Sequence, residues 1–198
     1  MNKTNTTKIV GIGLLTAIVV VLQALAVGIR FGTFTITLTL APIIIGAALF
    51  GPLAGAWLGF VFSIVVLITD AATFMAISIP GTIITVILKG TLAGLFAGLV
   101  YVALEKRGKF LAVIVAGVVA PVVNTGLFLL GCRLFFFDTI KEWAAGAGFE
   151  NAGLFMITAF VGLNFVIELV VNLVLSSAIV QVVKIGKKQF APAEEKQN

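Results

Sequence analysis

Two charged residues lie inside long apolar segments of the chain, and they are the first candidates for chemistry. Lys89 falls within the apolar residues 81–104, and Glu168 falls within the apolar residues 154–183. An ionisable group at the centre of a membrane-spanning helix costs about 2.5–3.5 kcal/mol on insertion scales, so it usually marks a functional site. The alternative is a structural ion pair between Lys89 and Glu168, which the sequence leaves open.

Amide side chains accompany the two charges. Asn164 and Asn172 lie four residues before and after Glu168. A helix turns by about 100° per residue, so the three residues share one face. Asn124 and Gln23 interrupt two further apolar segments. Because lipid offers no hydrogen-bond partner, these groups must face protein or water. They predict either a polar binding site or interhelical hydrogen bonds that only hold the bundle together. The predicted substrate-binding residues are Lys89, Asn124, Asn164 and Glu168.

Residue types that catalysis commonly requires are missing from the sequence. The chain contains no histidine and a single cysteine, Cys132. It therefore lacks the commonest general base and cannot form an internal disulfide or a cysteine cluster for a metal. Neither a G-x-x-x-x-G-K-[ST] phosphate loop nor a G-x-S-x-G motif occurs in the sequence, so ATP hydrolysis and serine hydrolysis are disfavoured. We expect no enzyme, no metal and no cofactor.

Composition indicates a membrane protein. The chain is 61% hydrophobic and 11% charged, with a mean hydropathy of +1.22, whereas soluble domains are about 45–50% apolar and about 25% charged. A membrane-spanning helix needs about 20 apolar residues. We predict an all-α six-transmembrane-helix bundle that forms one substrate-binding domain over residues 1–186, followed by a disordered cytoplasmic tail over residues 187–198. The predicted helices cover residues 9–28, 38–50, 53–68, 81–104, 110–130 and 154–183, with loops at residues 71–80 and 133–151.

The basic residues predict the orientation of this bundle. With six spans, both termini share one side of the membrane, and that side holds nine of the thirteen lysines and arginines. Cytoplasmic loops carry an excess of these residues, so we predict that both termini are cytoplasmic. The nine are Lys3, Lys8, Lys106, Arg107, Lys109, Lys184, Lys187, Lys188 and Lys196.

Several stretches of the sequence resemble a known family. They are KIVGIGLLTA at residues 8–17 and the hairpin APIIIGAALFGPLAGAWLGFVFSIVVLI at residues 41–68. Together with six helices in about 200 residues, these stretches resemble the substrate-binding S-components of energy-coupling factor (ECF) transporters. Three further stretches resemble the pantothenate-specific members: KGTLAGLFAGLVY at 89–101, NTGLFLLG at 124–131 and NFVIELVVN at 164–172.

The resemblance implies a division of labour between subunits. This chain would bind a vitamin from outside, while a membrane coupling subunit and two cytoplasmic ATPases supply the energy. Gly13 and Ala17 match the family's small-residue motif on the first helix, which contacts the coupling subunit. The ligand site would be lined by the four residues predicted above, with the first loop as a lid and with Phe31, Phe34 and Trp57 as aromatic cover.

The resemblance also implies roles for the site residues. Lys89 would pair with a substrate carboxylate, although the pantothenate-specific members tend to carry arginine there. Asn124 and Asn164 would bind amide or hydroxyl groups, and Glu168 would accept from a hydroxyl or fix Lys89. Pantothenate is the leading ligand, and riboflavin and folate are alternatives. Outside this family, the remaining hypotheses are a stand-alone secondary transporter, a membrane enzyme and a scaffold.

Overall fold

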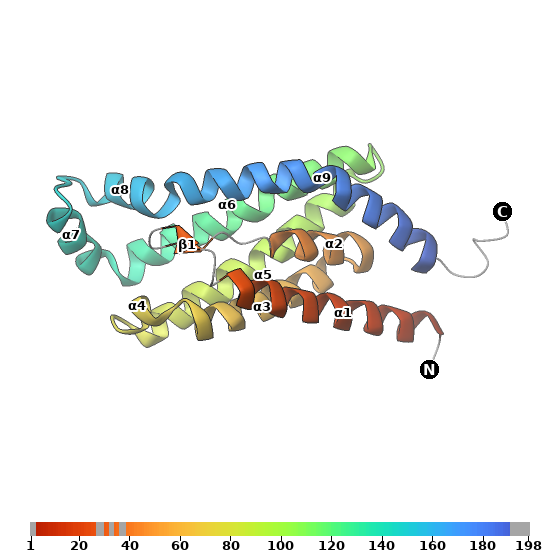
Figure 1. Ribbon diagram of the computed structural model, residues 1–198, viewed down its shortest axis with the longest axis horizontal. Coiled ribbons are helices and arrows are strands. Elements are labelled where there is room, and N and C mark those ends of the chain that lie inside the picture. Colours follow the sequence, from red (N-terminus) through yellow and green to blue (C-terminus); the bar gives the residue numbers. More distant parts are fainter. Residues whose placement is uncertain (1–2, 27–29, 32–33, 36–38, 191–198) are drawn as a thin grey trace.

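The computed structural model describes residues 3–26, 30–31, 34–35 and 39–190, and helices dominate it. Long helices lie side by side along the long axis of one elongated bundle (Figure 1). The longer ones are α1 (Lys3–Ala26), α2 (Leu40–Phe50), α3 (Pro52–Thr69), α5 (Ile79–Leu104), α6 (Lys109–Phe135) and α9 (Gly162–Phe190). The shorter elements are β1 (Arg30–Phe31), which pairs antiparallel with β2 (Phe34–Thr35), and the helices α4 (Ala72–Met75), α7 (Phe137–Gly146), α8 (Ala152–Phe155) and η1 (Met156–Val161).

Five of these helices, α1, α3, α5, α6 and α9, are long and apolar enough to cross a membrane. The helix α2 has only 11 residues, and eight of them are buried. It packs against all five long helices, so it lies inside the bundle. The predicted all-helical membrane architecture is therefore confirmed, whereas a sixth complete span stays a prediction.

Helices α2 and α3 meet in a tight turn that the sequence predicts from Gly51-Pro52. Gly51 has φ 96°, a backbone conformation that glycine adopts without the Cβ clash other residues meet. Pro52 follows at the first position of α3, where its missing N–H group has no helical partner to lose. The turn sends α3 back along the bundle, antiparallel to α2.

Helices α3 and α5 touch through their backbones. Glycines recur at every fourth residue on both helices, at Gly55 and Gly59 of α3 and at Gly90 and Gly94 of α5. A Cβ atom added at Gly59 would overlap the Gly90 carbonyl oxygen, and one added at Gly94 would overlap that of Gly55. Small residues at this spacing allow membrane helices to approach closely. The Ser63 hydroxyl continues the contact by donating to the Val86 carbonyl oxygen, at 2.7 Å.

The predicted loop at residues 133–151 is wrong, because the chain continues as helix through most of it. Helix α6 extends to Phe135, and α7 follows at once. Ile140 and Ala144 of α7 are buried, while Asp138, Lys141 and Glu142 are exposed. This amphipathic helix closes a second apolar core of Cys132, Phe136, Ile140 and Met156. Likewise, the predicted loop at residues 71–80 holds the short helix α4, whose Phe74 ring packs against Phe136.

The last predicted helix is displaced towards the C-terminus. Residues 154–161 belong to α8 and the π-helix η1, and α9 begins at Gly162 after a break in the helical dihedral angles, with φ 8° and ψ −125°. Helix α9 continues to Phe190, so residues 187–190 of the predicted tail are helical, and residues 191–198 lie outside the described residues.

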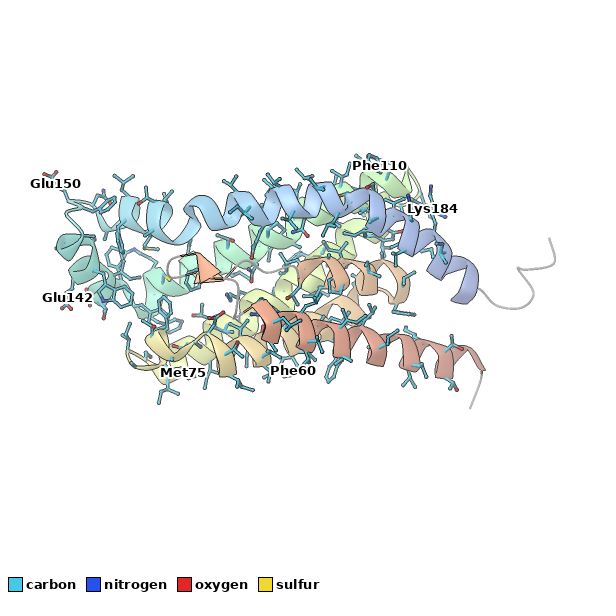
Figure 2. The ribbon with its side chains drawn as sticks, viewed as in Figure 1. Phe60, Met75, Phe110, Glu142, Glu150 and Lys184 are labelled. Atoms are coloured by element: carbon cyan, nitrogen blue, oxygen red, sulfur yellow. The ribbon has the colours of Figure 1, made fainter. Side chains whose placement is uncertain are left out.

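The two ends of the bundle differ in charge. Helix α1 begins and α9 ends at one end of the long axis, and α4, α7 and α8 lie at the other (Figure 1). Figure 2 shows Lys184 and Phe110 near the first end, and Glu142 and Glu150 at the second. The exposed residues Lys106, Arg107 and Lys109 follow α5 near the first end. This arrangement agrees with termini on one side of the membrane, and their cytoplasmic location stays a prediction.

The α3–α5 contact predicts a strong effect of a larger residue. We expect Gly94→Val to destabilise the protein by at least about 2 kcal/mol, because the backbone of Gly55 cannot move aside. In a thermal melt in detergent, the midpoint should fall by roughly 4–8 °C.

Gly126→Val is the matched control, since a Cβ atom at Gly126 of α6 meets nothing within 4 Å. Equal melting midpoints for the two variants would show that α3 and α5 do not pack through these glycines.

Candidate functional site

Lys89 lies in the middle of α5, on the side that faces α6. Its ammonium group lies over the Phe128 ring of α6, 5.0 Å from the ring centroid. A cation over an aromatic face is stabilised by the ring's quadrupole. Of the two charges that the sequence singled out, Lys89 thus lies against Phe128 of α6, and Glu168 is buried on α9.

Asn124 lies on α6, one helical turn before Phe128, so both residues face the same side. Its side chain is buried at 8% exposure. Its Oδ1 atom has no hydrogen-bond partner among the residues that the structure describes. A buried polar atom without a partner costs about 1–3 kcal/mol, so a hydrogen-bond donor placed beside it would be stabilised. Asn124 therefore lies next to the Lys89–Phe128 contact with an open acceptor.

The predicted polar stripe on α9 faces the protein interior, as expected. Glu168 and Asn172 are each 3% exposed, and Ser176 is 1% exposed. Asn172 and Ser176 pack beside Gly117 of α6, within 3.8 Å of a Cβ placed there. Asn164 belongs to α9 at the same helical spacing, but its side chain lies outside the described part of the chain.

A further pair of buried polar residues joins α1 to the start of α2. The Thr39 hydroxyl donates to Oε1 of Gln23 at 3.1 Å, and both residues are fully buried. The sequence placed Gln23 in the interior but did not identify Thr39. Thr85 was also missed, and it lies one turn before Lys89, 4% exposed, packed against Gly131 of α6. Thr85 precedes Lys89 by four residues, and this helical spacing could have identified it from the sequence.

The helix contacts place these groups in one layer across the bundle. Ile43 of α2 packs on Gly94, and Ala47 packs on Gly98. The two helices therefore run in the same direction, and residues of α2 pair with residues of α5 at a constant offset. By the same offset, Thr39 falls at the level of Gly90, next to Lys89. In the α5–α6 contact, Thr85 meets Gly131 and Lys89 meets Phe128. Lys89, Thr39 and Asn124 consequently lie within about two helical turns of one another along the axis.

Gly13 and Ala17 lie on a different surface. Both are exposed on α1, and a Cβ atom at Gly13 would meet nothing within 4 Å. Nearby, the indole Nε1 of Trp57 donates to the Thr16 hydroxyl at 3.2 Å. Trp57 is 50% exposed at the outer surface of α3, so the prediction that it covers a ligand is wrong. The side chains of Phe31 and Phe34 lie outside the described residues.

Comparison with protein-family models gives one assignment. Residues 7–180 match the family described as ECF transporter, substrate-specific component. Comparisons with curated proteins and with solved structures find no match.

The match covers most of the chain and agrees with its multi-pass apolar helices. Proteins of this family bind small-molecule substrates and work with a membrane coupling subunit and ATPases, and they are transport subunits rather than enzymes. The chain belongs to the substrate-specific component family of ECF transporters.

Proposed function

We propose that this chain is the vitamin-binding subunit of an ATP-driven importer and that pantothenate is its ligand. The observation that carries the choice of ligand is the position of Lys89. It is a cation in the middle of a membrane helix, beside an aromatic ring and a buried amide whose Oδ1 has no partner in the part of the chain that the structure describes. A cation at this depth favours an anionic substrate, because desolvation strengthens the attraction between opposite charges.

The neighbouring groups fit the remaining parts of pantothenate, which has a carboxylate, an amide and two hydroxyl groups. Lys89 pairs with the carboxylate. Asn124 and Asn164 bind the amide or hydroxyl groups, and Glu168 accepts from a hydroxyl or holds Lys89. Phe128 adds an apolar contact beside the charge. Riboflavin and folate are the alternative ligands, and of these folate also carries carboxylates.

The coupling subunit binds the exposed small residues of α1 in this proposal. Gly13 and Ala17 are four residues apart on the exposed face of α1, so a partner helix can approach the α1 backbone there. With both termini in the cytoplasm, the ATPases lie at the end of the bundle that carries Lys106, Arg107 and Lys184. The polar layer around Lys89 then receives substrate from the opposite, outer side.

Calorimetric titration of the detergent-purified chain tests the ligand. We expect pantothenate to bind, and panthenol, which carries an alcohol in place of the carboxylate, to bind about 10- to 150-fold more weakly, the range for a charge-assisted hydrogen bond. Lys89→Met should abolish this difference.

Lys141→Met is the control, because Lys141 is exposed on α7 and pairs with Asp138. Equal affinity of the unaltered chain for pantothenate and panthenol would remove Lys89 from the carboxylate site. Binding of riboflavin or folate alone would keep the transport role and replace the ligand.

Substitutions on α1 test the partner surface. Gly13→Leu and Ala17→Leu should prevent co-purification with the coupling subunit and ATPases while leaving the vitamin's dissociation constant unchanged, because neither position touches the polar layer. Gly126→Leu adds the same bulk to an open surface of α6 and should leave co-purification intact. Full assembly by both α1 variants would place the coupling interface elsewhere.

A further inference from the structure

Gln23 is a buried amide that pairs with the described residues through only one of its two polar atoms. Its Oε1 atom accepts from the Thr39 hydroxyl. Its Nε2 atom, which carries two N–H donors, has no hydrogen-bond partner among the described residues. The residue is 0% exposed, so bulk solvent does not reach these donors. The donors of Gln23 therefore carry a cost that a bound molecule would remove.

The bond from Thr39 determines what kind of group can fill this position. Because the Thr39 hydroxyl already donates to Oε1, the atom left without a partner among the described residues is the Nε2 donor. The matching ligand atom is an acceptor oxygen, such as a carboxylate or a carbonyl oxygen. Lys89, at the same level of the bundle, also offers only donors. The two side chains thus select the same chemistry from different helices.

The start of α2 favours the same ligand chemistry. Thr39 is the N-cap residue of α2, but its side chain makes no capping bond, because its hydroxyl is directed to Gln23. The first backbone N–H groups of a helix carry a partial positive charge. Here they lie in the bundle interior, with Leu40 1% exposed and Ala41 9% exposed. An oxygen-rich group beside Gln23 would gain from this charge.

We propose that Gln23 is a substrate-binding residue, whose Nε2 donates to an acceptor oxygen of the transported molecule, with Thr39 orienting the amide. The inference rests on the proposed function and adds α1 and the start of α2 to the site. It explains why an amide is buried at the level of Lys89 with its Nε2 left without a partner among the described residues.

The test replaces both members of the pair by apolar groups of similar size. The double variant Gln23→Met, Thr39→Val leaves no orphaned hydrogen-bonding group at this position. We expect the ligand-free melting midpoint to stay within about a degree of the unaltered chain, or to rise. We expect the affinity for pantothenate, measured by calorimetric titration, to fall at least tenfold. Gln181→Met is the control, because Gln181 is exposed on α9.

A second variant covers the case in which the double variant does not fold. Gln23→Asn keeps the amide but shortens the side chain by one methylene, which moves its donors away from the ligand. It should also weaken pantothenate binding at least tenfold. Thr39→Ser keeps the orienting hydroxyl and should retain the affinity that Thr39→Val loses.

The outcomes separate this inference from the function on which it rests. Unchanged pantothenate affinity in the Gln23 variants would overturn the inference alone, as would a lower ligand-free melting midpoint without loss of affinity. If the unaltered chain binds none of pantothenate, riboflavin and folate, the proposed vitamin-binding function fails, and the inference fails with it.

Discussion

The backbone contact between α3 and α5 is the constraint on which the rest of the structure depends. Gly90 and Gly94 face α3, and any side chain there would overlap the carbonyl oxygens of Gly59 and Gly55. Lys89 precedes Gly90 and is therefore rotated by about 100° around α5, away from α3. That rotation directs it to Phe128 of α6. The orientation of Lys89 thus follows from the glycines that pack α5 on α3.

The short helix α2 determines where along the axis the polar layer lies. It occupies the interior on one side of Thr39, with Ile43 and Ala47 packed on the glycines of α5. Apolar side chains fill this part of the bundle as one core. Near the level where α2 begins, four buried polar residues lie among them: Gln23, Thr39, Thr85 and Asn124.

Periodicity and residue type were sufficient to predict much of this arrangement. The long apolar segments predicted α1, α3, α5 and α6, because each is long enough to span lipid. Gly51-Pro52 predicted the turn before α3. The inward face of Glu168 and Asn172 followed from their spacing, since lipid excludes polar groups.

Other features depend on packing between distant segments and were missed. Residues 137–146 carry enough charge to suggest a loop, yet Ile140 and Ala144 place α7 over the second core. Trp57 was assigned to the ligand because of its type, but its position on α3 directs it to the surface beside Thr16. The bond between Thr39 and Gln23 joins residues 16 positions apart across the first loop, and no short spacing rule connects them.

The central claim is that this chain binds the substrate while other subunits drive its movement. Uptake of radiolabelled pantothenate into proteoliposomes tests it most directly, with the chain alone and with its coupling subunit and ATPases. We predict accumulation only when all subunits and ATP are present, although the chain alone binds the vitamin. Accumulation by the chain alone, driven by an ion gradient, would show instead that it is a self-contained transporter.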